Sequence, residues 1–172
     1  PPRAFLVAPL TKGRCSVGGV FALQLNTLTS SAVVLTNVDA AADRAVKIGG
    51  THSGGSVSVS GGTLAGQTRG LEFGTMAGTP VSVSGVAISI AVTASAYGIY
   101  FAAAITGAAP VSINGVAITG VPNWGLVFQQ ALTGIDISVR DASIPGASTG
   151  VYFVATLTSC AVTMVNVDVP AA

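Results

Sequence analysis

A short apolar phrase recurs six times along the 172 residues, at intervals of 23, 25, 28, 27 and 25 residues. Each copy consists of a small residue, an apolar residue, a variable residue and a second apolar residue. The copies begin at Ala22, Ala45, Gly70, Gly98, Gly125 and Gly150. Periods of roughly 20–50 residues are typical of chains that stack one structural unit on the next. The spacing therefore predicts a solenoid.

A second phrase follows each copy of the first, and in both phrases apolar residues alternate with small or polar ones. The second phrases are Val33-Val-Leu-Thr-Asn, Val57-Ser-Val-Ser-Gly, Val81-Ser-Val-Ser-Gly, Val111-Ser-Ile-Asn-Gly, Ile137-Ser-Val-Arg-Asp and Val162-Thr-Met-Val-Asn. A period of two places alternate side chains on one face of a strand. The pattern predicts two short strands per turn with their apolar residues facing inward.

One column at the end of the second phrase contains only glycine, asparagine and aspartate. Its members are Asn37, Gly61, Gly85, Gly115, Asp141 and Asn166. These residue types tolerate positive φ, so we expect a left-handed corner at this column. An inward-facing pattern resumes after the corner, as at Val86 and Ile88, and predicts a third short strand. Gly78, between the two phrases, is expected to lie in a loop and to tolerate substitution better than a corner glycine.

The coil built from these parts is that of a right-handed parallel β-helix, an all-β solenoid of about six coils. A left-handed hexapeptide helix would need roughly 18 residues per coil with little variation, and the intervals here are longer and uneven. We assign the β-helix repeats to residues 20–172 and an irregular leading coil or N-terminal edge to residues 1–19. Neither end has a clear polar cap, so we expect an uncapped fragment flanked by further coils of a longer chain.

The phrase Gly98-Ile-Tyr-Phe, followed by Val111-Ser-Ile-Asn-Gly-Val-Ala-Ile, resembles the parallel β-helix repeat of pectin-lyase-like proteins. The resemblance covers residues 20–169 and implies the fold, but lyases, hydrolases, tailspikes and adhesins all use that fold. The Ala-, Val-, Gly-, Ser- and Thr-rich composition is also similar to that of the dispersed gene family surface proteins of trypanosomatid parasites. This second resemblance implies a repetitive cell-surface protein.

Charged residues make up 8% of the chain and the net charge is +1. Soluble domains usually carry about 25% charged residues. The low charge gives no electrostatic basis for binding nucleic acid or acidic lipid. A neutral, hydroxyl-rich surface suits an extracellular or cell-surface location. The uncharged residues 86–105 are long enough for a membrane helix, but they keep the repeat columns in register, so we expect no membrane span.

Few titratable groups are candidates for catalysis. Asp136, Arg140 and Asp141 lie in one coil, but a pair of catalytic carboxylates would have to converge on one bond. Asp136 and Asp141 are expected at opposite ends of one strand, roughly 16 Å apart. We therefore assign Asp141 to the corner and expect no catalytic residue. The enzyme alternative is a polysaccharide lyase or glycoside hydrolase whose active coil lies around residues 136–141 or outside this segment.

Two outward strips are candidates for binding. In the first, Lys47 and Glu72 are expected to form an exposed ion pair, and the column continues with Tyr100, Val127 and Tyr152. Such aromatic side chains could stack on sugar rings or pack against one another across strands. Trp124 is expected on a loop, either as a partner contact or as a hydrophobic anchor. The second strip is a hydroxyl array that includes Ser82 and Ser112 and could contact polysaccharide.

The remaining polar and sulfur groups indicate no metal site and no cofactor. Arg44 is expected to be solvated in a connecting loop. His52 lies in the glycine-rich residues 49–55, without a second histidine or a cysteine at ligand spacing, and we interpret this run as a flexible connection. Cys15 and Cys160 belong to the first and last coils, too far apart for a disulfide.

From these features we expect a non-catalytic β-helical rod segment of a large secreted or cell-surface protein. It would serve adhesion, display or carbohydrate contact, and its partners would be carbohydrate or a host or cell-surface protein.

Overall fold

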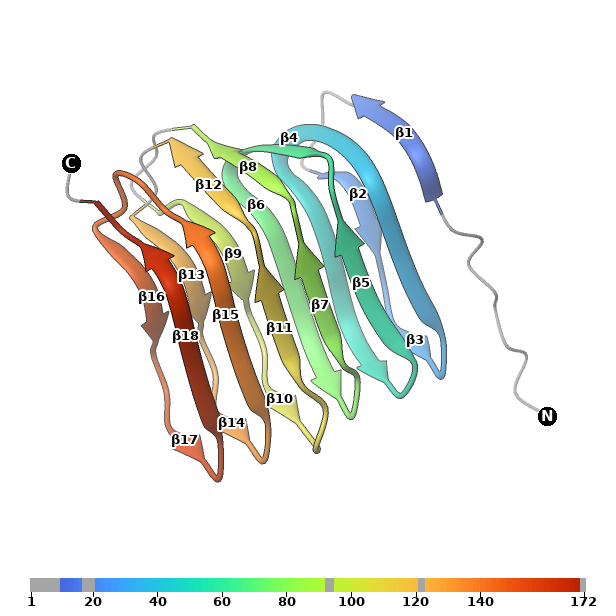
Figure 1. Cartoon of the computed structure of the whole chain (residues 1–172). Helices are drawn as coiled ribbons and strands as arrows, with labels where there is room; N and C mark the ends of the chain where they lie inside the picture. The colour runs from blue at the N-terminus through green and yellow to red at the C-terminus, as the bar shows by residue number, and fades with distance from the viewer. Residues whose placement is uncertain (1–9, 17–20, 92–94, 121–122, 171–172) are drawn as a thin grey trace.

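The computed structural model describes residues 10–16, 21–91, 95–120 and 123–170 and shows a parallel β-solenoid of about six turns (Figure 1). About 70% of the chain is strand, and the described residues contain no helix. Every strand pairing among the described residues is parallel, as between β7 (Val81–Ser84) and β11 (Val111–Asn114). None of the described residues belongs to a helix long and apolar enough to cross a bilayer. Residues 86–105, considered above as a membrane helix, contain β8 (Ala87–Ile90), β9 (Tyr97–Phe101) and the first residue of β10 (Ile105–Thr106).

Eighteen strands make up the described turns, and the longer ones continue from one side of the solenoid to another. They are β1 (Leu10–Ser16), β2 (Phe21–Leu25), β3 (Leu28–Thr29), β4 (Ala32–Ser53), β5 (Ser56–Ser60), β6 (Thr63–Ala77), β7 (Val81–Ser84), β8 (Ala87–Ile90), β9 (Tyr97–Phe101), β10 (Ile105–Thr106), β11 (Val111–Asn114), β12 (Ala117–Gly120), β13 (Trp124–Phe128), β14 (Leu132–Thr133), β15 (Asp136–Ser143), β16 (Thr149–Phe153), β17 (Leu157–Thr158) and β18 (Ala161–Asp168). Within the expected leading coil, residues 10–16 form β1, which pairs in register with β4.

The interior is filled by columns of aliphatic and phenyl side chains, one residue from each turn. Leu71, Ile99, Leu126 and Val151 are aligned as direct ladder partners, as the repeat predicts. The neighbouring column stacks the rings of Phe73, Phe101, Phe128 and Phe153, with successive centroids 4.6, 4.6 and 4.9 Å apart. Each ring thus packs on the ring of the next turn, and this contact favours the in-register arrangement over any shifted one.

The corner column has the backbone conformation that its residue types indicate. All six of its residues have φ between 50° and 61°. No atom lies within 4 Å of the position that a Cβ would occupy at Gly85, so the backbone conformation alone favours glycine there. Between the last two turns the corner side chains also interact, because the amide of Asn166 donates a 2.8 Å hydrogen bond to Asp141.

A second left-handed column lies on the other side of the solenoid. It consists of Ser30, Gly54, Gly78, Gly107, Gly134 and Ser159, all with positive φ. Each of these residues follows a two-residue phrase, such as Leu132-Thr133. In four turns the phrase forms a small strand of its own, β3, β10, β14 or β17, and in the other two it forms the end of β4 or β6. Gly78 lies in the connection between β6 and β7, as expected, but the expectation that it is more permissive than a corner glycine is wrong, since its φ of 60° equals that of Gly85.

The glycines that open the first phrase are required by packing. A Cβ on Gly70, Gly98 or Gly125 would lie 2.2–2.5 Å from the Cγ2 of an isoleucine across the interior. These isoleucines are Ile88, Ile118 and Ile144. In the first two turns the register places alanines, Ala22 and Ala45, in the glycine column. The residues in the isoleucine column of the same turns are Ala40 and Leu64, which lack the branched Cγ2. Side-chain size is therefore matched across the interior.

Most of the glycine-rich run is part of the ladder, so its interpretation as a flexible connection is wrong for residues 49–53, and only Gly54 and Gly55 connect β4 to β5. Residues 49–53 belong to β4, and a register shift between Ile48 and Thr51 marks a bulge at Gly49 and Gly50. The bulge lets β4 accommodate an extra residue and still return to register with β6. His52 pairs with Leu28 on one side and Met76 on the other, which places its ring in an interior column.

Candidate functional site

Charged and aromatic side chains gather on the outer surface of one side of the solenoid. This side is formed by β2, β9, β13 and β16 and by parts of β4 and β6. We call its eight outward residues the aromatic–cationic face: they are Arg44, Lys47, Arg69, Glu72, Tyr97, Tyr100, Trp124 and Tyr152. They belong to two neighbouring columns, because Arg69, Tyr97 and Trp124 are ladder partners, as are Glu72, Tyr100, Val127 and Tyr152.

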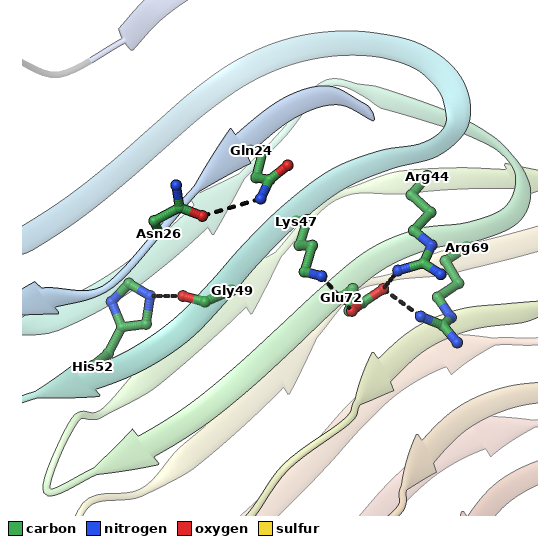
Figure 2. A network of polar contacts seen from close by, with 8 residues as sticks. All are labelled: Gln24, Asn26, Arg44, Lys47, Gly49, His52, Arg69 and Glu72. Atoms are coloured by element: carbon green, nitrogen blue, oxygen red, sulfur yellow. Dashed lines mark hydrogen bonds and ion pairs between the residues drawn. The ribbon is translucent and has the colours of Figure 1, made fainter. Parts of the chain in front are cut away.

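Glu72 is the centre of the charged part of this face (Figure 2). Its carboxylate contacts Nη1 of Arg44 at 3.1 Å, Nζ of Lys47 at 3.4 Å and Nη1 of Arg69. The Glu72 side chain is only 5% exposed. The pair with Lys47 is therefore present as expected, but the expectation that it is exposed is wrong. Burying a carboxylate is costly unless opposite charges and hydrogen bonds surround it, and three cations do so here.

Arg44 and Arg69 were not among the expected site residues. Arg44 belongs to β4 and contacts Glu72, so its assignment to a solvated loop is wrong. Gly70 and Leu71 are both buried, so the outward positions Arg69 and Glu72 are three residues apart rather than two. A strict period of two therefore does not place Arg69 and Glu72 on the same face.

The aromatic rings of the face stack on one another along the solenoid. The Trp124 ring lies between Tyr97, with centroids 5.1 Å apart, and Tyr152, with centroids 6.5 Å apart. Its plane is 13° from that of Tyr97 and 12° from that of Tyr152. Tyr97 also contacts Tyr100, with centroids 4.6 Å apart. The Arg69 guanidinium lies 4.4 Å from the Tyr100 ring centroid, which is cation–π geometry. Burial raises the pKa of the Tyr100 hydroxyl, and the nearby Arg69 partly opposes this.

This stacking limits what the rings can do. Trp124 has a neighbouring ring on each face, so neither face is open to a sugar ring. Its placement on a loop is wrong as well, because it is the first residue of β13 and pairs with Tyr97 and Thr149. Tyr152, at 42% exposure, is the most accessible ring of the face.

The hydroxyl strip lies on a different side of the solenoid. Ser82 of β7 and Ser112 of β11 are direct ladder partners, and both are exposed. The structure thus brings Tyr100, Trp124 and Tyr152 together, but it does not bring them together with Ser82 and Ser112.

Several carboxylates have structural partners. Asp141 accepts the corner hydrogen bond from Asn166, and Asp39 accepts a 2.9 Å hydrogen bond from the backbone N–H of Thr63. Asp136 and Asp141 belong to the same strand, β15, as expected. The described residues contain no group of three or more His, Cys, Asp or Glu side chains that could hold a metal ion.

The histidine and the described cysteine are engaged inside the ladder. His52 is 2% exposed, and its Nε2 lies 2.9 Å from the carbonyl oxygen of Gly49 (Figure 2). Burial lowers the pKa of His52 below its ordinary 6.5, and the hydrogen bond to Gly49 partly opposes this. The thiol of Cys160 is free and half-buried, 3.3 Å from the carbonyl oxygen of Leu132.

No protein-family model, curated protein or solved structure matches this chain.

Proposed function

We propose that this chain is a non-catalytic rod segment of a secreted or cell-surface protein, used for adhesion, display or carbohydrate contact. The observation that carries the proposal is the structural use of three of its six acidic groups. Glu72 is neutralised by three cations, Asp141 is bonded at the corner, and Asp39 accepts a backbone N–H. A carboxylate held in this way is poorly suited to donate or accept a proton during turnover.

The continuous ladder supports a role as a rigid element. Backbone hydrogen bonds run from turn to turn along the axis, as from Gly85 to Asn114 and from Gly115 to Arg140, each at 3.0 Å. Each turn contacts the next through backbone and interior columns, so the surface residues keep fixed spacings. A rigid scaffold of this kind can hold binding groups in a constant array. The nearly neutral, hydroxyl-rich composition supports an extracellular setting.

Turnover assays test the non-catalytic part of the proposal. The chain is incubated with acidic and neutral polysaccharides, and new reducing ends and unsaturated products are measured. We expect no release above that of heat-denatured protein. Turnover that is lost in the Asp136→Asn variant, with folding intact, would establish the lyase or hydrolase alternative. An Asp141→Asn variant should leave any such turnover nearly unchanged, because a corner residue needs only to tolerate positive φ.

Labelling of intact cells tests the location. An antibody raised against this chain should stain unpermeabilised cells of the source organism or detect the protein in the medium. Signal that appears only after permeabilisation would contradict a secreted or surface role. A glycan array with the chain as the soluble probe then tests carbohydrate contact separately from adhesion to protein.

A further inference from the structure

All the tyrosines and the single tryptophan of the chain lie on the aromatic–cationic face. The chain has only three tyrosines and one tryptophan, against 22 glycines. Large polar aromatic side chains are therefore rare in this chain, and all of them lie on one side. Tyrosine, tryptophan and arginine are the residue types that carry most of the binding energy at protein interfaces. Their collection on one side marks that side as an interaction surface.

Positive charge is concentrated on the same face. Arg44, Lys47 and Arg69 surround the carboxylate of Glu72, so the eight residues of the face together carry a net charge of +2. The net charge of the whole chain is only +1. The three cationic side chains are 20–28% exposed, so they remain accessible from solvent. A partner that complements this face therefore carries negative charge.

The arrangement of the rings favours a protein partner over a sugar. The ring of Trp124 lies between Tyr97 and Tyr152, so its two faces already have partners and cannot stack on a pyranose ring. Tyrosine and tryptophan rings carry hydroxyl and indole N–H groups at their edges, which can hydrogen-bond to carboxylates and backbone carbonyls. Because the rings are held by one another, little side-chain freedom is lost when a partner binds.

We propose that the aromatic–cationic face binds an acidic protein segment, a stretch of polypeptide rich in aspartate and glutamate. Carboxylates of the partner contact Lys47 and Arg69, and its side chains pack on the exposed ring of Tyr152. This inference rests on the proposed adhesive role and names the class of partner for it.

Binding to immobilised poly-L-glutamate tests the inference, with the whole chain in solution at about 50 mM salt, where surface charges are weakly screened. We expect saturable binding that weakens as salt is added. The double variant Lys47→Gln/Tyr152→Ala should bind about tenfold more weakly, because it loses one cation and one aromatic contact. Arg140→Gln, which removes an exposed cation of β15, and Val165→Ala, which removes an exposed apolar side chain of β18 from the same outward column, are matched controls on another side. Both controls should bind like the original chain.

Three results would overturn the inference. These are no binding to poly-L-glutamate, equal weakening in the control variants, and displacement by a neutral glucan as effective as displacement by free polyglutamate. Thermal melting checks the folding of each variant. If the double variant melts early, Tyr152→Ala alone, at a 42% exposed position, provides the comparison. A chain found at the cell surface without turnover, yet indifferent to polyglutamate, would refute this inference alone and leave the proposed function standing.

Discussion

At the scale of single residues, His52 makes the folded chain sensitive to acid. Its imidazole occupies an interior column beside Leu28 and Met76 and has one hydrogen bond, to Gly49. Because burial lowers its pKa below 6.5, the folded chain binds this proton less readily than the unfolded chain does. The stabilisation that depends on the neutral ring is therefore complete above pH 6.5 and is lost progressively as the pH falls below that value.

The variant His52→Leu tests this origin of acid sensitivity. Leucine occupies the equivalent position in three other turns, at Leu28, Leu132 and Leu157, so the variant restores the apolar column. We expect the free energy of unfolding of the original chain to fall between pH 7.5 and pH 5.5, and that of the variant to fall less. Urea denaturation at the two pH values measures both. An equal fall in both proteins would show that other groups cause the acid sensitivity.

The left-handed corners predict a second residue-scale effect. Gly85→Val should lower the free energy of unfolding by about 1–2 kcal/mol, since a side chain is disfavoured at positive φ. Gly78→Val should cost a similar amount, because both glycines have φ of 60° and open space around the added Cβ. The control Ala87→Val introduces the same side chain at an exposed position of strand β8 and should change stability by about 0.5 kcal/mol or less. A tolerated Gly85→Val with normal melting would contradict the assigned corner.

At the scale of strands, the packing of glycine against isoleucine across the interior predicts a coupled pair. A Cβ at Gly70 would lie 2.2 Å from Cγ2 of Ile88 and 2.9 Å from the carbonyl oxygen of Gly98. Gly70→Ala should therefore destabilise by about 1–3 kcal/mol through overpacking. Ile88→Ala should destabilise by about 2–5 kcal/mol through the cavity it leaves.

The double variant Gly70→Ala/Ile88→Ala measures the coupling. Its destabilisation should be smaller than the sum of the two single effects by at least about 0.5 kcal/mol, because the alanine at 70 then fills space left by Ile88. Gly70→Ala combined with Ile144→Ala, whose isoleucine packs against Gly125 instead, should be additive. Additivity in both pairs would mean that Gly70 and Ile88 do not face each other.

The sequence predicted the strands of the two main phrases well, because alternation directly reports which side chains face the interior. It missed the phrase that forms β3, β10, β14 and β17, since two residues followed by a turn are too short for a periodic signal. The recurrence of Leu-Thr before glycine or serine, as at Leu132, could have revealed that phrase. The run around His52 was misjudged because glycine-rich composition also fits a loop.

The candidate site was predicted only in part, for a related reason. The column from Lys47 to Tyr152 follows from the period of two and was found. Arg69 and Tyr97 lie three residues before Glu72 and Tyr100, and two buried residues separate the members of each pair. A strict period of two therefore does not assign Arg69 and Tyr97 to the face of that column. The burial of Glu72 likewise depends on its contacts with Arg44 and Arg69, and the alternating pattern does not predict those contacts.

At the scale of the whole molecule, the account requires that turns distant in sequence lie at fixed heights along one axis. Val34, Ser58, Ser82, Ser112, Ser138 and Thr163 form one outward column of successive ladder partners. Parallel strands lie about 4.8 Å apart. Thr163 should therefore be about 14 Å from Ser82, 19 Å from Ser58 and 24 Å from Val34, measured between Cα atoms.

Electron paramagnetic resonance distances between paired spin labels test this claim most directly. Cysteine is introduced at Thr163 together with Ser82, Ser58 or Val34, in a chain whose Cys15 and Cys160 are replaced by serine. The linkers of the spin labels add a similar length to every pair. The account therefore predicts that the mean distance rises by about 4.8 Å from the pair with Ser82 to the pair with Ser58, and again to the pair with Val34. Distances that fail to increase in this order would contradict the stacked, in-register solenoid.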